Sequence, residues 1–318
     1  MPEPLRVGVV GTGSQGRHHV RILAGMPGVR LVGVYDLDPE VARAAAQLGE
    51  VPAVDDLEQL AGGIDAAVVA VPTQSHREVG CRLLERGIDV LMEKPIAPSV
   101  ADAEALVRAA RNRVLAVGHV EYFNPAVQAL LDRRLEPGFA EVHRLAAFKR
   151  RSLDINVILD LMIHDLQVMH ALDPSPVLEI RANGINVLTE QIDIANVRIE
   201  LASGCVANLT ASRVSREPVR KLRLFSRAGA YYSLDYDART VEEVRLVPGD
   251  GQPTIEKQTL EVGVTDALEA ELASFLAACR GEAARFVNAE QGLVALRTAL
   301  SVVEIMSRTA AGRGSAGG

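Results

Sequence analysis

The feature that most constrains the fold is a glycine-rich segment, GTGSQG, that directly follows the apolar run Leu5–Val10. A strand, a G-x-G-x-x-G turn and a helix together are the fingerprint of a dinucleotide-binding βαβ unit. In that reading Gly11 makes the tight turn, Gly13 lets the backbone approach a pyrophosphate, and Gly16 allows close helix packing. The helix N-terminus would then offer N–H donors to the phosphates. The alternative is a plain tight turn.

Strand and helix patterns alternate through the first 120 residues. After Leu5–Val10 the apolar runs are Leu31–Tyr35, Ala66–Val71, Val90–Met92 and Val114–Val117. This rhythm predicts an α/β domain at residues 1–120, with a doubly wound parallel sheet of the Rossmann type. Beyond it, short alternating runs joined by turns such as LASGCV and SRAGAY predict a second, α+β domain at residues 121–309, with a mainly antiparallel open sheet. Residues 310–318, AAGRGSAGG, are expected to be a flexible tail.

An acidic residue follows the second predicted strand. Asp36, in YDLDPE, occupies the position where the fingerprint places an acid that accepts hydrogen bonds from the adenosine ribose. No basic residue is adjacent, and a carboxylate repels a 2′-phosphate, so NAD is favoured over NADP. The two histidines of the first helix, His18 and His19, are interpreted as packing residues.

The next two strands end in VPTQSH and MEKP, at the edge where doubly wound sheets bind ligands. His76 is a candidate for the cofactor cleft, whereas Thr73 or Ser75 can equally cap the next helix. Lys94 is one of only four lysines among 34 basic residues. Unlike arginine, lysine presents a compact ammonium whose charge can be tuned. A surface lysine is the alternative, but position and scarcity favour a functional role.

A polar stripe crosses the apolar helical segment NVILDLMIHDLQVMH, residues 156–170. At about 100° per residue, Asn156, Asp160, His164 and Gln167 share one face, and Asp165 points the opposite way. Burying such groups is costly unless they are paired. The stripe is therefore a catalytic site or a satisfied core network. A zinc pair is the third possibility, but no further ligand with suitable spacing is visible, and we expect no metal.

Basic residues precede this helix in the segment FKRRS. Lys149, Arg150 and Arg151 could hold a diphosphate, because arginine forks match phosphate oxygens. They could equally be a solvated strand end that discourages edge pairing. The same two interpretations apply to Arg213, Arg216 and Arg220.

Composition excludes several classes. A net charge of −7 argues against general nucleic-acid binding. No apolar run approaches the roughly 18 residues of a membrane span, and the chain starts without a signal-peptide pattern. Its three cysteines have neither metal nor disulfide spacing. We therefore expect a cytoplasmic protein that binds neither nucleic acid nor membrane.

Together the motifs resemble the glucose–fructose oxidoreductase, inositol dehydrogenase and rhizopine-catabolism (Gfo/Idh/MocA) family. The matching segments, in family order, are GTGSQGRHH, VYDLDPE, VPTQSHREV, GIDVLMEKPIA, VGHVEYFNP and LDLMIHDL. The resemblance implies a Rossmann domain followed by an α+β domain whose open sheet often forms oligomer contacts, and hence a homodimer or homotetramer. It also implies that the lysine of an E-K-P motif and the histidine of a D-x-x-x-H helix act in catalysis. These are Lys94, Asp160 and His164.

The resemblance also implies a wider set of site residues. For the cofactor, NAD, they are Gly11, Thr12, Gly13, Ser14, Gln15, Gly16, Asp36, Pro72, Thr73, His76, Glu93 and Lys94. For the substrate they are Lys94, Tyr122, Asn124, Arg150, Arg151, Asp160 and His164. In this scheme His164 takes the hydroxyl proton, because histidine titrates near neutrality. Asp160 orients the ring or a substrate hydroxyl, and Lys94 stabilises the reacting oxygen.

One departure bears on the substrate. Many relatives carry a glycine pair before the D-x-x-x-H helix, whereas this chain reads INVILDLMIHDL. That form, with GHVEYFNP, resembles the nucleotide-sugar branch of the family, which includes UDP-N-acetylglucosamine 3-dehydrogenases. The expected activity is therefore NAD-dependent oxidation of a UDP-linked N-acetylhexosamine at the C3 hydroxyl. The alternatives are an inositol or free-sugar dehydrogenase and a non-catalytic NAD-binding regulator.

Overall fold

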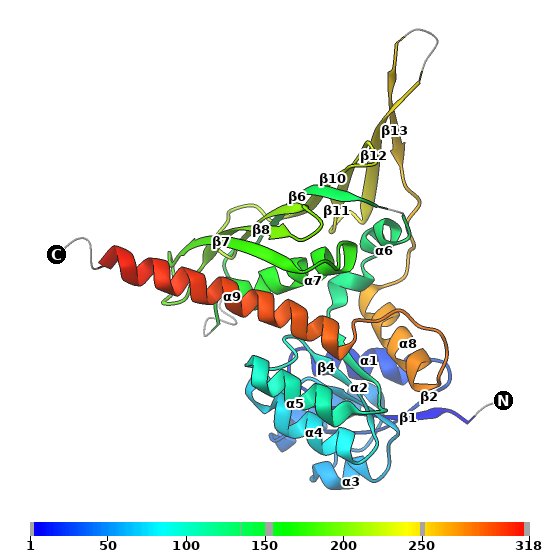
Figure 1. The fold of residues 1–318 in the computed structure, drawn as a ribbon. Coiled ribbons are helices and arrows are strands. Elements are labelled where there is room, and N and C mark those ends of the chain that lie inside the picture. Colours follow the sequence, from blue (N-terminus) through cyan, green and yellow to red (C-terminus); the bar gives the residue numbers. More distant parts are fainter. Residues whose placement is uncertain (1–2, 134, 150–154, 249–251, 315–318) are drawn as a thin grey trace. The chain divides into compact units, whose positions relative to one another are not determined.

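The computed structural model describes residues 3–133, 135–149, 155–248 and 252–314, with side chains as far as Arg308. The chain forms two compact units (Figure 1). The first comprises residues 1–120 and 266–293, and the second comprises residues 121–265 and 294–318. Our sequence-based division had assigned residues 266–293 to the second domain.

The first unit is built on a five-stranded parallel sheet of order β2-β1-β3-β4-β5. Its strands are β1 Leu5–Val10, β2 Val29–Tyr35, β3 Ala66–Val69, β4 Asp89–Glu93 and β5 Leu115–Gly118. Its helices are α1 Gly16–Gly25, α2 Pro39–Gly49, α3 Leu57–Ala61, α4 His76–Glu85, α5 Val100–Ala110 and α8 Ala267–Cys279, with a 3₁₀ turn η1 at Thr73–Ser75. This arrangement confirms the predicted doubly wound sheet, since buried β-branched runs alternate with amphipathic helices.

Helix α8 accounts for the difference between this division and the sequence-based one. Leu272, Phe275 and Leu276 of α8 are buried in the same core as Val9 of β1 and Leu23 of α1. The chain thus returns to the first unit at residues 266–293 and then re-enters the second unit. The hydrophobic pattern of the sequence does not reveal such a return, because an apolar helix face can pack on either sheet.

The second unit contains an eight-stranded sheet of order β13-β12-β11-β10-β6-β9-β8-β7. Its strands are β6 Pro137–Leu145, β7 Val177–Ile185, β8 Ile194–Leu201, β9 Val206–Ser212, β10 Val219–Ser226, β11 Ala230–Asp235, β12 Thr240–Val247 and β13 Thr254–Thr259. All neighbours are antiparallel except β6 and β9. The predicted hairpin turns are present, with Gly204 and Gly229 at positive φ. The sheet is therefore mainly antiparallel, as predicted.

Helices cover one face of this sheet (Figure 1). They are α6 Pro125–Leu131, the π-helical turn η3 Ile158–Met162, α7 Ile163–Leu172 and the later part of α9 Ala289–Gly314. A 3₁₀ turn, η2 Val120–Phe123, precedes α6. Because α9 continues to Gly314, the helix extends into the tail that we expected to be flexible from residue 310. Residues 315–318 lie outside the described residues.

Strand β6 was missed in the sequence, although it lies in the interior of the sheet. From Ala140 onward its residues alternate between a buried and a more exposed face, with Ala140, Val142 and Arg144 buried. An arginine at an inward position breaks the apolar alternation by which a strand is recognised. Because of the buried Arg144, the strand could not be recognised from its hydrophobic pattern. The same arginine supports the helix that carries the D-x-x-x-H motif, as described below.

Candidate active site

The glycine-rich loop has the geometry that a dinucleotide site requires. Gly11 has φ +83°, and a Cβ there would lie 2.6 Å from the backbone of Ala70. A Cβ on Gly16 would lie 1.9 Å from the carbonyl oxygen of Gly11. The fold itself therefore requires these two glycines. A Cβ on Gly13 would meet nothing within 4 Å, so this glycine leaves open space at the loop. The loop fits a closely approaching pyrophosphate.

Asp36 is tied to this loop. Its Oδ2 accepts hydrogen bonds from the Thr12 N–H at 2.6 Å and from the Thr12 hydroxyl at 3.2 Å, and its Oδ1 accepts one from the Asp38 N–H. A carboxylate offers about four lone-pair sites, so a ribose hydroxyl can still join. The other two loop side chains predicted to meet the cofactor, Ser14 and Gln15, are exposed at the start of α1.

His76 has a different role from the one we predicted. The ring is buried, with Nδ1 3.0 Å from the Pro95 carbonyl oxygen and Nε2 3.0 Å from the Val71 carbonyl oxygen. Burial lowers its pKa, although the hydrogen bonds to backbone oppose this. With both ring nitrogens engaged by backbone, the side chain ties the end of β3 to the segment after Lys94. His76 therefore supports this edge of the sheet, and its contact with the cofactor stays a prediction.

Lys94 directly follows β4, at the carboxyl end of the sheet where ligands of this fold bind. Its side chain is half-buried, and the Lys94–Pro95 peptide bond is cis. The Lys94 N–H donates to Glu93 Oε2 at 3.1 Å, and Glu93 Oε1 lies 2.9 Å from His19 Nε2. The predicted cofactor residues Pro72 and Thr73 lie just after β3 at the same edge, exposed and half-buried respectively.

The polar stripe of the second unit is not one regular helix. Residues Ile158–Met162 form a π-helical turn, and α7 begins only at Ile163. Asp160 lies within the π turn and His164 follows in α7, both partly exposed. Asn156, which we placed on the stripe, accepts a hydrogen bond from the Leu159 N–H at the start of the turn. Such π turns are frequent at functional sites, and the assumption of 100° per residue could not anticipate one.

Asp165, the second acid of the apolar helical segment, has a structural role. It is 2% exposed and forms a bidentate ion pair with Arg144, at 2.8 and 2.7 Å. Arg144 also donates to Glu121 Oε1 at 2.8 Å and lies over the ring of Tyr236. Burial raises the pKa of Asp165, and the charge of Arg144 offsets this only in part. The pair holds α7 to β6 by its buried face, so the helix serves as a rigid support for His164.

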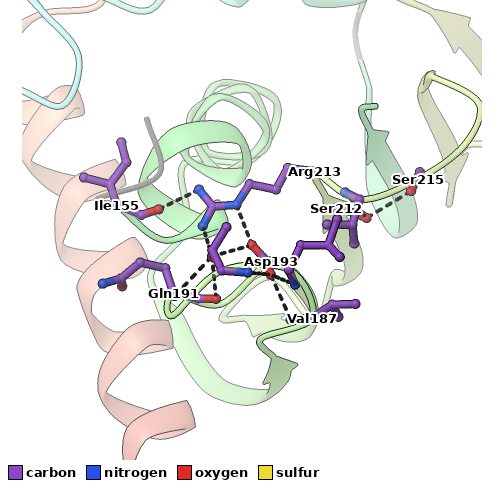
Figure 2. Close-up of polar contacts among 10 residues, drawn as sticks. Ile155, Val187, Gln191, Asp193, Ser212, Arg213 and Ser215 are labelled. Carbon is purple, nitrogen blue, oxygen red and sulfur yellow. Dashed lines mark hydrogen bonds and ion pairs between the residues drawn. The ribbon is translucent and has the colours of Figure 1, made fainter. Parts of the chain in front are cut away.

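A second buried pair holds the chain just before the π turn (Figure 2). Asp193 is fully buried, and its Oδ2 accepts the backbone N–H groups of residues 187, 188 and 189 at 2.7–2.9 Å. Arg213 donates from Nε to Asp193 Oδ1 at 2.8 Å and from Nη1 to the Ile155 carbonyl oxygen at 2.7 Å. Arg213 therefore has a structural role. Arg216 is exposed, and Arg220 pairs with Glu121 and Asp237 at 3.5 Å.

Two predicted substrate residues have distinct environments. Asn124 is buried, accepts the Ala126 N–H at the start of α6 and donates to the Tyr236 carbonyl oxygen. Its amide thus holds the start of α6 to the residue that follows β11, and its substrate role stays a prediction. Tyr122 is half-buried, with its ring edge-on to Phe123. Of the basic cluster, Lys149 is exposed, and Arg150 and Arg151 lie outside the described residues.

No metal site and no membrane span were found in the part of the chain that the structure describes. There, no three His, Cys, Asp or Glu side chains gather in a way that could hold a metal ion. Every helix in this part is too short or too polar to cross a bilayer.

Known proteins are similar to this chain in both sequence and fold. A sequence profile of an oxidoreductase family with an NAD-binding Rossmann fold, GFO_IDH_MocA, matches residues 5–119. The UDP-N-acetylglucosamine 3-dehydrogenase of Acidithiobacillus ferrooxidans is 36% identical over 303 residues, which are 94% of this chain and 96% of that protein. The chain belongs to this oxidoreductase family. The resemblance noted in the sequence is thereby confirmed.

Solved structures agree. The structure of the Acidithiobacillus ferrooxidans UDP-N-acetylglucosamine 3-dehydrogenase matches with a TM-score of 0.89 at 34% identity, covering 95% of this chain and 98% of that one. An inositol dehydrogenase homologue from Azotobacter vinelandii, complexed with NAD+, matches with a TM-score of 0.83 at 19% identity, covering 97% and 96%. At that identity the second match shows the fold alone. The protein is thus an NAD-dependent dehydrogenase of this family.

Proposed function

We propose that the protein oxidises a UDP-linked N-acetylhexosamine, most simply UDP-N-acetylglucosamine, to its 3-keto product. The observation that carries this proposal is the 36% identity to a UDP-N-acetylglucosamine 3-dehydrogenase along nearly the whole of both chains. Inositol dehydrogenases are also relatives, but the match to one from Saccharopolyspora erythraea covers only 54% of this chain and 49% of that protein.

In the proposed reaction, NAD would supply, when bound, the acceptor for the hydride of the sugar carbon. His164 takes the proton of the sugar hydroxyl, a contribution worth roughly 10²–10⁴ in rate. Asp160, four residues earlier, orients the imidazole or holds a neighbouring hydroxyl. Lys94 donates to the reacting oxygen and offsets the negative charge that develops there.

The supports of these groups fit the proposal. His164 lies beside Asp165, whose buried pair with Arg144 fixes the helix from the opposite side. Lys94 follows a strand end held by Glu93 and, through Pro95, by His76. A positioned catalytic group needs this kind of rigid support, because small displacements cost large factors in rate. A regulator that only binds NAD would need neither group.

The lysine role can be tested directly. Lys94→Met keeps the aliphatic stem and removes the charge, so turnover should fall by roughly 10²–10³, as when an oxyanion donor is lost. Lys94→Arg should also fail, because a guanidinium fork does not reproduce a point donor. High activity of the arginine variant would indicate that general positive charge suffices.

The diphosphate is proposed to bind the cluster Lys149, Arg150 and Arg151. A chain of net charge −7 that accepts a dianionic diphosphate needs a local basic patch. Each charge-assisted contact is typically worth about 1.5–3 kcal/mol. The double variant Arg150→Gln/Arg151→Gln should therefore weaken UDP binding by about two orders of magnitude, measured by calorimetric titration, and leave NAD binding intact. Equal UDP affinity in both proteins would remove the cluster from the site.

We also propose a cytoplasmic homodimer or homotetramer. On the sheet of the second unit, the rings of Phe139, Phe225 and Tyr231 form a row with centroids 5.8 and 5.0 Å apart, and Phe225 is 41% exposed. An exposed aromatic row on a sheet face is a common feature of interfaces. Analytical ultracentrifugation of the full chain tests this, and a monomer at micromolar concentration would contradict it.

A further inference from the structure

Lys94, whose catalytic role is itself the proposal made above, is held in place by a short chain of hydrogen bonds. Glu93 stands between Lys94 and His19. One carboxylate oxygen accepts the Lys94 backbone N–H at 3.1 Å, and the other lies 2.9 Å from His19 Nε2. A carboxylate can only accept, so Nε2 carries the proton and donates it. The two hydrogen bonds join His19, Glu93 and Lys94 in one line.

The two side chains in this line are largely shielded from solvent. The His19 side chain is 1% exposed and that of Glu93 is 15% exposed. Burial raises the pKa of Glu93, but the hydrogen bond from His19 and the neighbouring Lys94 outweigh it, and the net direction is downward. Glu93 is therefore an ionised acceptor at neutral pH. A charge-assisted hydrogen bond in such surroundings is stronger and more directional than one at the surface.

His19 belongs to α1, the helix that begins at the glycine-rich loop. The segment with Lys94 is thus fastened to the element whose N-terminus faces the cofactor phosphates. His76 of α4 holds the same segment from its other side, through the carbonyl of Pro95. Two buried histidines on two helices therefore fix the residues that flank Lys94.

A second acid nearby shows that the ionisation is selective. Glu271 of α8 is 1% exposed, and neither of its carboxyl oxygens has a hydrogen-bond partner among the described residues. Burial and the negative charge of Glu93 raise its pKa well above the usual range. Two carboxyl groups in one buried environment do not both ionise readily. Glu93, which has partners, is charged, whereas Glu271 stays neutral and lies outside the line.

We propose that His19 and Glu93 are positioning residues for Lys94, which fix the lysine relative to the cofactor-binding helix and so set the rate of the hydride-transfer step. Neither residue touches the reacting atoms. Their effect is on the placement of the Lys94 ammonium, and misplacement by about 1 Å can cost up to about 10² in rate. The expected signature is a loss in kcat with little change in NAD binding.

The test compares variants of the full-length enzyme. His19→Leu removes the donor but keeps apolar bulk, and we expect kcat to fall about 10- to 100-fold while the Kd for NADH changes by less than about threefold. His19→Gln keeps an N–H donor and should recover most of that loss. Glu271→Gln is the matched control, because it alters a neighbouring buried acid outside the line, and it should keep wild-type kcat.

A double variant separates positioning from general damage. His19→Leu removes one donor, and Glu93→Gln leaves a single acceptor oxygen for two N–H donors, so both variants disrupt the same chain of hydrogen bonds. The double variant should therefore be hardly worse than the more damaging single variant, whereas independent effects would multiply. Should His19→Leu fail to fold, His19→Gln and Glu93→Gln still allow the comparison. A His19→Leu enzyme with a lowered Tm but wild-type kcat would overturn the inference.

Lys94→Met, assayed in parallel, tells the two proposals apart. If it is inactive while His19→Leu turns over normally, only the positioning role is lost. If Lys94→Met itself turns over normally, the catalytic role of the lysine is wrong, and the positioning role falls with it.

Discussion

The substitution Arg144→Met tests how the buried face of α7 is held. The guanidinium makes three charge-assisted hydrogen bonds at 2.7–2.8 Å, two to Asp165 and one to Glu121, and all three side chains are at most 10% exposed. Methionine keeps much of the apolar stem but leaves two buried carboxyl groups without their cation. Breaking a buried pair in this way costs about 3–5 kcal/mol.

Arg223→Met is the matched control. Arg223 lies on the neighbouring strand β10, is 54% exposed and pairs with Glu141 at 3.5 Å. An exposed pair contributes about 0–1 kcal/mol. Urea unfolding followed by far-ultraviolet circular dichroism measures both variants against the wild type. Similar losses for Arg144→Met and Arg223→Met would refute the claim that Arg144 anchors the helix.

The pH dependence of the same variant has a definite sign. Burial already raises the pKa of Asp165, and Arg144 opposes that rise. Removing Arg144 raises the pKa further, so the folded state binds a proton that the unfolded state releases. A group of this kind loses stability as pH rises above its unfolded pKa. The deficit of Arg144→Met should therefore be smaller at pH 5 than at pH 8, and Asp165→Asn added to Arg144→Met should recover part of it.

Three further substitutions test the catalytic histidine, the choice of cofactor and the buried Asp193. His164→Asn should lower kcat by roughly 10²–10⁴ without changing the Kd for NADH, and near-normal turnover would leave the stripe purely structural. Asp36→Ser with Leu37→Arg should raise the affinity for NADP relative to NAD, because Leu37 directly follows Asp36 and is 84% exposed. Fluorescence titration with both reduced cofactors would show no shift if Asp36 does not face the ribose. Burial raises the pKa of Asp193, but its backbone N–H partners, Thr189 and Arg213 outweigh this and lower it, so the stabilisation is present above the unfolded pKa of about 4 and is lost as pH falls below it. Asp193→Asn should accordingly differ most from wild type in urea unfolding at neutral pH and least in acid, and a constant difference would contradict this.

The sequence was informative wherever function imposes local patterns. The glycine fingerprint, Asp36 and the segment with Lys94 could be placed because their spacing along the chain already fixes their geometry. The D-x-x-x-H pair was also visible, because polar groups are conspicuous in an apolar helix.

What the sequence could not supply were partners distant along the chain. Asp165 could be recognised in the sequence as a buried acid, but its partner cation, Arg144, lies 21 residues earlier. The strand that carries Arg144 was not recognised, because the arginine interrupts its apolar pattern. His19 was interpreted as packing because its acceptor, Glu93, is 74 residues away. His76 and Asn124 were predicted to contact ligands, and the sequence does not show that their polar atoms also bind backbone groups as far away as Pro95 and Tyr236. The π turn at Asp160 depends on packing and has no signature in the 3.6-residue period.

Turnover of the purified protein with a matched set of substrates tests the central claim most directly. UDP-N-acetylglucosamine, free N-acetylglucosamine and myo-inositol are each incubated with NAD, formation of NADH is followed by absorbance, and the product is identified by mass and carbon NMR. The proposed function predicts saturable NADH formation with the UDP-sugar, a ketone at C3, and little turnover of the two free polyols. Rapid oxidation of myo-inositol with none of UDP-N-acetylglucosamine would contradict it and identify an inositol dehydrogenase.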